Sequence, residues 1–162
     1  MSEPLISVII PTYGRESALR DSIVDVLKQD YSNYEVLVVD QTPKHQPEIE
    51  AYLEEQSRTS KIQWYRLDWA SLPGARNYAV RRSAGEIILF IDDDVLLEPG
   101  FLAAHAKNYQ NPEIGAVAGR VFDRMKMEDS AKGYTQGEGN YTELEYLPPQ
   151  AMDPGVAWYY ID

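Results

Sequence analysis

The chain has 162 residues, of which 44% are apolar and 25% are charged, and it carries a net charge of −11. This length and composition are those of one globular domain and exclude an intrinsically disordered chain. The chain has no cysteine, which excludes disulfides and thiolate metal sites, and its acidic balance argues against nucleic acid as a partner.

The first predicted element is a strand over residues 5–10, a short β-branched run that stops at Pro11. Ser17 is the predicted cap of a helix whose apolar residues recur at helical spacing. A second apolar run, over residues 35–39, predicts another buried strand, and this strand ends at Asp40.

Pro47 opens a second predicted helix, and residues 62–67 form a third predicted strand that ends at Asp68. Pro73 opens a third helix, which ends near Gly85. Helices placed between strands in this way are the crossovers that a parallel sheet requires.

The fourth predicted strand covers residues 87–91, a helix follows from Pro99, and residues 116–122 form a fifth strand. Continuous apolar strands that alternate with helices predict an α/β fold, a doubly wound, mostly parallel sheet with helices on both faces. We expect residues 1–122 to form this domain. Residues 123–162, rich in Glu, Gly, Tyr and Pro, are expected to be an irregular segment of a truncated C-terminal part.

Three carboxylates, Asp92, Asp93 and Asp94, follow the fourth strand directly, at the edge where parallel sheets bind ligands. Carboxylates about 4 Å apart repel each other by roughly 4 kcal/mol at an effective dielectric constant near 20, so the three must share a proton, turn to water or bind a cation. In an extended segment Asp92 and Asp94 share one side and Asp93 points away. Such oxygen ligands suit Mg²⁺ or Mn²⁺; the alternative is a solvated turn.

The loop after the first strand, Pro-Thr-Tyr-Gly-Arg over residues 11–15, lacks the G-x-G-x-x-G fingerprint that cradles a pyrophosphate. A bound nucleoside diphosphate would need other counter-charges, which a metal ion on the three aspartates and Arg15 or Arg76 can supply. Tyr13 is expected either to lie against a base or to cover the sheet edge. Asp40 is expected either to accept hydrogen bonds from ribose hydroxyls or to stabilise a turn.

The stretch Leu-Pro-Gly-Ala-Arg-Asn, residues 72–77, opens the third helix, so its free backbone N–H groups face the same sheet edge. Arg76 in this stretch either meets a phosphate or pairs with an aspartate and holds the site together. Both alternatives place Arg76 at the predicted site.

Three segments occur in a characteristic order and spacing: SVIIPTYGR, EVLVVDQT and LPGARNYAVRRSAGEIILFIDDDV. Together they resemble the N-terminal half of family 2 glycosyltransferases, which have the GT-A fold, and the resemblance covers residues 5–122. Each motif alone is weak, whereas the ordered set is specific.

The resemblance implies a role for each matching residue. Pro11, Thr12 and Tyr13 match the segment that lines the nucleotide base, and Asp40 matches the acid that contacts the base or the ribose. Arg15 follows this segment directly, and its predicted role rests on the charge that a diphosphate needs.

The resemblance also assigns the three aspartates, because Asp92 and Asp94 match the outer residues of the family's Asp-x-Asp motif. It implies that Asp94 is the metal ligand that bridges to the donor diphosphate. Asp92 or Asp93 would meet the ribose or the waters of the metal, which makes Asp92 a second candidate metal ligand.

The resemblance implies an inverting, metal-dependent enzyme that transfers a sugar from a UDP-, GDP- or dTDP-sugar to a hydroxyl of a saccharide or lipid-linked acceptor. In the family the general base and the acceptor wall come from the C-terminal half. No carboxylate of residues 123–162 lies in a matching motif, so the catalytic base stays unassigned and this chain is expected to bind the donor better than it transfers the sugar.

Other classes of protein fit the sequence less well. A nucleotide-sugar-binding module without turnover is the main alternative. The missing glycine fingerprint argues against a NAD-type dehydrogenase. The Pro-Thr-Tyr-Gly-Arg loop argues against a response-regulator receiver or a nucleotidyltransferase.

The sequence also bears on location. No run approaches 18 apolar residues, and the first residues lack the features of a signal peptide. We expect a cytoplasmic protein, located at the inner face of the membrane if residues outside this chain supply a peripheral membrane contact.

Overall fold

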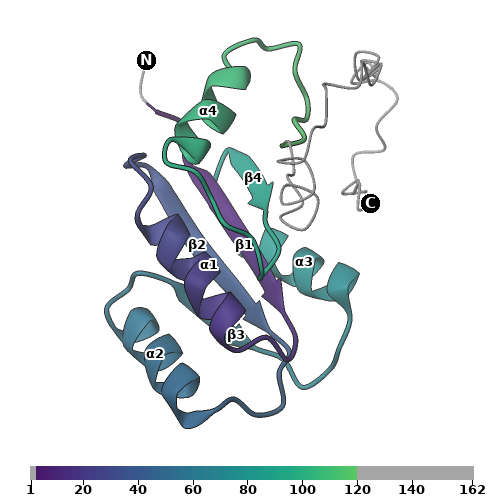
Figure 1. The fold of residues 1–162 in the computed structure, drawn as a ribbon. Coiled ribbons are helices and arrows are strands. Elements are labelled where there is room, and N and C mark those ends of the chain that lie inside the picture. Colours follow the sequence, from purple (N-terminus) through teal and green to yellow (C-terminus); the bar gives the residue numbers. More distant parts are fainter. Residues whose placement is uncertain (1–2, 120–162) are drawn as a thin grey trace, which may run out of the picture. The chain divides into compact units, whose positions relative to one another are not determined.

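The computed structural model describes residues 3–119. These residues form one sheet and four helices in strict alternation (Figure 1). The elements are β1 (Ile6–Thr12), α1 (Ser17–Leu27), β2 (Tyr34–Asp40), α2 (Pro47–Arg58), β3 (Gln63–Arg66), α3 (Leu72–Val80), β4 (Ile87–Phe90) and α4 (Phe101–Asn108).

The sheet has the strand order β3-β2-β1-β4, and every neighbouring pair is parallel. Strand β1 runs past the predicted stop, because Pro11 still pairs with Val39 of β2. Proline has no N–H for the ladder, but the pairing of β1 with β4 already ends at Ile9 and Phe90, before the proline. The carboxyl ends of β1, β2 and β4 therefore lie at one edge.

Helices cover both faces of the sheet, which confirms the predicted doubly wound fold. On one face Ile9, Leu37 and Val39 pack against Ala75 and Ala79 of α3. Successive side chains of a strand point to opposite faces, so Val8 and Ile10 of β1 point away from this cluster. Figure 1 shows α1 lying over the sheet. The fully buried residues of that helix are Leu19, Ile23 and Val26.

Two predicted helix starts shift by one residue. Glu16, not Ser17, is the N-cap residue of α1, and its side chain makes no capping hydrogen bond. Helix α3 begins at Leu72, and the hydroxyl of the N-cap residue Ser71 accepts a hydrogen bond from the Gly74 amide at 3.2 Å. The hydroxyl cap, rather than the proline, therefore sets the start of α3.

At the amino edge of the sheet, Glu35 joins three segments of the chain. Its carboxylate accepts hydrogen bonds from Ser7 Oγ, Gln63 Nε2 and the Ala84 amide, each at 2.6 Å. The Gly85 amide donates to Ser7 Oγ at 2.8 Å. A Cβ atom on Gly85 would lie 2.5 Å from the Ser7 backbone nitrogen, so this approach requires glycine.

The chain divides into two compact units, residues 1–107 and residues 108–162. In the described part of the second unit, residues 109–119 contain no strand, so the predicted fifth strand is absent over 116–119 and its remainder lies outside the described residues. The predicted boundary at residue 122 and the segment 123–162 also lie outside them and stay predictions.

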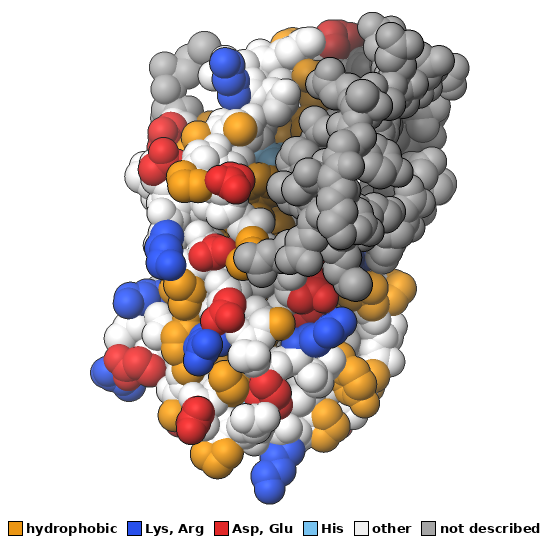
Figure 2. Space-filling view, viewed as in Figure 1, with side chains coloured by type: hydrophobic (Ala, Val, Ile, Leu, Met, Phe, Trp, Pro, Cys, Tyr) orange, Lys and Arg blue, Asp and Glu red, His pale blue; other side chains and the backbone are white. Residues whose placement is uncertain are grey.

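Acidic and basic side chains are interspersed over the face that carries α1 and α2 (Figure 2). Such a mixed surface does not create a field of a single sign on that face.

Candidate functional site

A cleft of about 490 Å³ opens at the carboxyl edge of the sheet. It brings together residues from the ends of β1 and β2, the loop before α3 and the segment after β4, which are far apart in sequence. The lining residues are Pro11, Thr12, Tyr13, Arg15, Gln41, Ala70, Ser71, Leu72, Asp92, Asp93 and Asp94. The cleft therefore lies where an open parallel sheet binds its ligands.

The three aspartates, Asp92, Asp93 and Asp94, which we call the acidic triplet, lie directly beyond β4. The Ile91 amide still donates to the Ile9 carbonyl at 3.1 Å, so the sheet positions the first aspartate, and the chain then turns at Asp93 and Asp94. All three line the cleft. The prediction that Asp93 points away from the side shared by Asp92 and Asp94 is wrong, because the turn replaces the extended geometry that the prediction assumed.

Two arginines compensate the charge of the acidic triplet. Arg15 Nη2 lies 3.4 Å from Asp94 Oδ2, and Arg15 Nε lies 3.9 Å from Asp93 Oδ1. Arg76 Nη2 lies 3.4 Å from Asp92 Oδ1. These contacts are long for ion pairs with hydrogen bonds, so the carboxylates of Asp92 and Asp94, which are 55% and 47% exposed, remain open to a ligand.

Asp93 has the most buried carboxylate of the triplet, with 13% of its side chain exposed. Burial raises the pKa of Asp93, and the neighbouring charge of Asp94 raises it further. The Thr12 hydroxyl and the Arg15 guanidinium oppose this rise in the pKa. A cation bound beside the carboxylate would favour its ionised form for the same electrostatic reason.

The loop after β1 places the predicted residues in the cleft. Thr12 is buried at the end of the strand, whereas the Tyr13 ring is 57% exposed and Arg15 extends to the acidic triplet. An exposed aromatic ring at the rim of a cleft offers a flat apolar surface for a planar ligand. The structure thus brings Pro11, Thr12, Tyr13 and Arg15 to the same cleft as the triplet.

Of the two predicted roles of Asp40, the structure shows the stabilisation of a turn, through the Thr42 amide two residues further on. The Asp40 side chain is 0% exposed, and it does not line the cleft. One carboxylate oxygen accepts a hydrogen bond from the Thr42 amide at 2.8 Å, and the other lies 2.7 Å from His45 Nε2 and accepts from Trp64 Nε1 at 3.0 Å. In this geometry the other predicted role, a contact with a base or ribose, is blocked, because both carboxylate oxygens are buried and form hydrogen bonds within the protein.

Arg76 is buried, with 5% exposure, and its guanidinium lies 5.7 Å from the centre of the Phe90 ring. Of the two predicted roles, the structure shows the pairing with an aspartate, Asp92. Arg76 does not line the cleft itself. It therefore contacts the first aspartate of the triplet from a buried position outside the cleft wall.

Sequence reasoning missed part of the cleft wall. Gln41 Nε2 donates to the carbonyls of Trp69 and Ser71 at 2.8 and 3.2 Å, which ties the loop before α3 to the end of β2. The Trp69 ring lies so close to Gly74 that a Cβ there would be 2.5 Å away. The position of Gln41, directly after a strand-ending aspartate, was the available signal.

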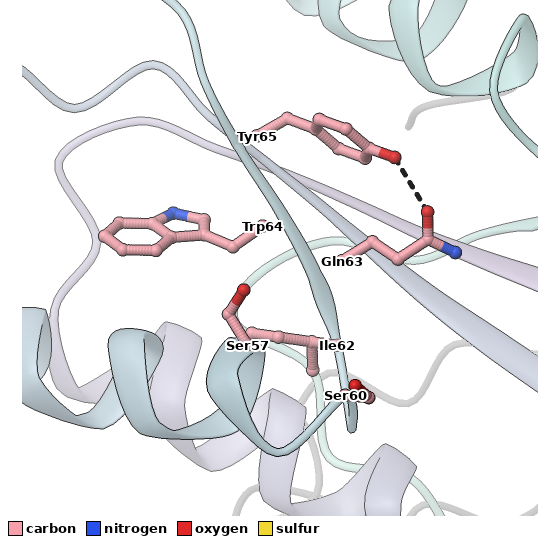
Figure 3. Close-up of a pocket in the computed structure, with 6 residues that line it drawn as sticks. All are labelled: Ser57, Ser60, Ile62, Gln63, Trp64 and Tyr65. Carbon is pink, nitrogen blue, oxygen red and sulfur yellow. Dashed lines mark hydrogen bonds between the residues drawn. The ribbon is translucent and has the colours of Figure 1, made fainter.

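A second pocket, of about 450 Å³, lies where the end of α2 meets β3 (Figure 3). Its polar contact within the pocket is a hydrogen bond from the Tyr65 hydroxyl to Gln63 Oε1 at 2.7 Å. The lining residues, which include no carboxylate and no cationic side chain, are Ser57, Ser60, Ile62, Gln63, Trp64 and Tyr65. Of these two pockets, only the cleft at the carboxyl edge is lined by charged side chains.

The acidic triplet fits a hard cation only in part. Among residues 3–119 no three His, Cys, Asp or Glu side chains are grouped so that they could hold a metal ion by themselves. Asp92 and Asp94 nevertheless present two half-exposed carboxylates at the cleft. One or two carboxylates, with water and substrate phosphates completing the shell, are the usual ligand set for Mg²⁺, so the residues fit a metal that arrives with a phosphorylated ligand.

Comparison with known proteins agrees with this geometry. The family model "Glycosyl transferase family 2" matches residues 7–155. The O-antigen biosynthesis protein RfbC of Myxococcus xanthus is 32% identical over 123 residues, which are 74% of this chain and 9% of that protein. The UDP-Glc:alpha-D-GlcNAc-diphosphoundecaprenol beta-1,3-glucosyltransferase WfgD of Escherichia coli is 34% identical over 95 residues, which are 58% of this chain and 36% of that protein.

Solved structures agree as well. The mannosyltransferase PcManGT of Pyrobaculum calidifontis, solved with GDP-Man and Mn²⁺, has a TM-score of 0.62 and 25% identity, with coverage of 70% of this chain and 34% of its own. Residues 1–349 of TarS from S. aureus, solved with UDP-GlcNAc, have a TM-score of 0.56 and 25% identity, with coverage of 74% and 37%.

The chain therefore belongs to glycosyl transferase family 2, and its fold is the GT-A fold that the sequence predicted. It spans about a tenth to two fifths of the length of the relatives it matches. No helix within residues 3–119 is long and apolar enough to cross a membrane. The cytoplasmic location stays a prediction.

Proposed function

We propose that this chain forms the donor site of an inverting, metal-dependent glycosyltransferase. It would bind a UDP-, GDP- or dTDP-sugar, from which the sugar passes to a hydroxyl of a saccharide or lipid-linked acceptor. The observation that carries the proposal is the acidic triplet, which opens into a cleft shared with Tyr13 and Arg15. The relatives solved with GDP-Man and Mn²⁺ or with UDP-GlcNAc support it.

The exposed carboxylates of Asp92 and Asp94 would hold Mn²⁺ or Mg²⁺ together with the donor diphosphate, and Asp94 is the principal ligand. When bound, the metal acts as a Lewis acid that stabilises the charge of the leaving nucleoside diphosphate. Arg15, 56% exposed and paired with Asp94 in the structure, is placed to exchange this partner for a phosphate oxygen.

The rim of the cleft would hold the nucleoside. Tyr13 presents its exposed ring to the base. The loop before α3, which Gln41 holds through the Trp69 and Ser71 carbonyls, forms another part of the wall, where Leu72 adds an exposed apolar side chain. Arg76, which contacts Asp92 from outside the cleft wall, keeps the first aspartate of the triplet in place. None of these residues is placed as the general base.

Calorimetry with UDP-, GDP- and dTDP-sugars, with and without Mn²⁺, tests this proposal. We expect one nucleotide to bind in a manner that requires the metal, and Asp94→Ala to remove this requirement together with most of the affinity. Asp30→Ala, which removes the same charge at an exposed position outside the cleft, is the matched control. Equal metal-dependent binding by wild type and Asp94→Ala would refute the assignment, and a parallel transfer assay separates an enzyme from a binding module.

A further inference from the structure

Hydrogen bonds on either side of Arg15 join two loops at the carboxyl edge of the sheet. The Gly14 amide donates to Thr42 Oγ1 at 2.9 Å, and Glu16 Oε2 lies 3.2 Å from Nδ1 of His45. Gly14 has a φ of +68°, a left-handed conformation that glycine adopts without a steric penalty. Both neighbours of Arg15 are therefore anchored to the loop that follows β2.

The other side of His45 is anchored to the sheet. Its Nε2 lies 2.7 Å from Asp40 Oδ2, and both side chains are 0% exposed. The Trp64 indole of β3 donates to the same oxygen at 3.0 Å, and the Thr42 amide donates to the second oxygen at 2.8 Å. Asp40 is thus immobilised by three donors. Because the other ring nitrogen of His45 contacts Glu16, the ring joins Glu16 to this fixed carboxylate.

The contacts of the ring define its protonation state. Both ring nitrogens of His45 face carboxylate oxygens, which only accept hydrogen bonds when ionised. Both nitrogens must then carry a proton, so the ring is an imidazolium between two carboxylates. Burial lowers the pKa of His45, but the hydrogen bonds and charges of Asp40 and Glu16 outweigh this and raise it above its ordinary value.

We propose that His45 is a positioning residue for donor binding, which as an imidazolium joins Asp40 to Glu16 and so holds Tyr13 and Arg15 at the cleft. This inference rests on the proposed donor site and adds a residue that lies outside the cleft wall. The Gln46 amide, which also donates to Glu16 Oε2 at 3.3 Å, supports the same connection.

The connection depends on pH. Asp40 from β2 and Glu16 from the loop after β1 are the charged groups of residues 3–119 that act on the ring, and the β3 side contributes the neutral indole of Trp64. Because the pKa of His45 is raised in the folded chain, the stabilisation is complete below about pH 6.5 and is lost as the pH rises through the raised pKa. The neutral ring keeps one donor and releases one carboxylate, after which the loop that carries Arg15 loosens.

Ring NMR of the free chain tests the protonation state. The chain has two histidines, and burial lowers the pKa of His105, so the two rings titrate on opposite sides of about 6.5. We expect His45→Gln to remove the signal that titrates above this value. A His45 ring that is neutral at pH 6 would overturn the proposal.

Two variants then test the positioning role. In His45→Gln we expect amide exchange at Gly14 to accelerate, and the affinity for UDP or GDP with Mn²⁺ to fall, each by about tenfold. Glu16→Gln leaves the buried pair of Asp40 and His45 intact, and its amide can donate to the neutral ring. This variant should therefore bind the nucleotide at pH 7 about as well as wild type and lose the decline in affinity at alkaline pH.

The outcomes distinguish this inference from the proposed function. If the wild-type chain binds no nucleotide with Mn²⁺, the proposed function fails, while the ring titration and the Gly14 exchange still decide the role of His45. If wild type binds and Glu16→Gln keeps the wild-type pH profile, the inference fails alone. Glu54→Gln makes the same change at an exposed position of α2 and should leave both measurements unchanged.

Discussion

The two edges of the sheet both carry acidic residues, and they use them in opposite ways. At the amino edge, Glu35 accepts three hydrogen bonds of 2.6 Å from Ser7, Gln63 and the Ala84 amide. At the carboxyl edge, the acidic triplet lies 3.4 to 3.9 Å from the guanidinium groups of two arginines. Acids that are fully hydrogen-bonded within the protein stabilise it, whereas acids with long, exchangeable contacts remain available to a ligand.

The two edges also differ in electrostatic repulsion, which arises among the three aspartates at the carboxyl edge. A single carboxylate surrounded by donors, as at the amino edge, needs no further charge. Three carboxylates in sequence repel each other, and the arginines relieve this repulsion without burying Asp92 or Asp94. Mutations at the carboxyl edge should therefore change binding, and mutations at the amino edge should change stability.

The largest effect is expected for Asp94→Ala. Metal-dependent affinity for the nucleotide should fall by at least about a hundredfold, or ~2.8 kcal/mol. The unfolding free energy should stay within about 0.5 kcal/mol of wild type, because the side chain is 47% exposed and its removal relieves repulsion within the triplet. Calorimetry and urea unfolding measure the two quantities.

Asp30→Ala controls for the lost charge, since Asp30 is exposed and does not line the cleft. A large loss of stability in Asp94→Ala without a loss of binding would reverse the proposed contrast between the edges.

Gly85→Ala should give the largest effect at the amino edge. The new Cβ would lie 2.5 Å from the backbone nitrogen and the hydroxyl of Ser7 and 2.9 Å from the Leu5 carbonyl. Because backbone atoms cannot move aside cheaply, we expect a loss of about 2 kcal/mol in the unfolding free energy. Gly115→Ala is the matched control, because Gly115 has open space around it and a φ that suits alanine. Gly100→Ala would not serve, because the φ of +80° at Gly100 adds strain of its own. An unchanged unfolding midpoint for Gly85→Ala, compared with Gly115→Ala, would disprove the close packing.

Glu35→Ala removes the acceptor that joins the segments at this edge. Ser7 is fully buried, so its hydroxyl would lose its acceptor, and we expect a loss of about 1 to 2 kcal/mol in stability. Nucleotide affinity, measured on the fraction that stays folded, should not change. A parallel loss of affinity would show that the two edges are coupled.

Much of this contrast follows from sequence. Apolar runs that stop at Pro11, at Asp40 and at the acidic triplet predict parallel strands, and parallel strands bring their carboxyl ends to one edge. The gathering of Tyr13, Arg15 and the triplet in one cleft is a consequence of this topology. The contacts at the amino edge are harder to predict from the sequence, because the role of Glu35 depends on partners from β1, β3 and the turn before β4.

The remaining differences arise from contacts that periodicity does not encode. Asp40 became internal because Trp64 and His45, from two other segments, occupy the same carboxylate oxygen. Asp93 faces the cleft because the chain turns directly after β4. Both outcomes depend on a local turn or a long-range side-chain pair, whereas the positions of the strands depend on runs of several residues and are easier to predict.

The smallest expected effect is a difference between the two edges in how amide exchange depends on pH. The Gly14 amide at the carboxyl edge and the Gly85 amide at the amino edge each donate to a hydroxyl, at 2.9 and 2.8 Å, which makes them a matched pair. The raised pKa of His45 means that its stabilisation is present below about pH 6.5 and is lost as the pH rises through that pKa. Between about pH 6 and pH 9, amide exchange at Gly14 should therefore accelerate by a few-fold more than exchange at Gly85, after correction for base catalysis. A ratio of the two rates that stays constant with pH would show that His45 does not control the carboxyl edge. A ratio that changes with pH in wild type but not in Glu16→Gln would show that the control acts through Glu16.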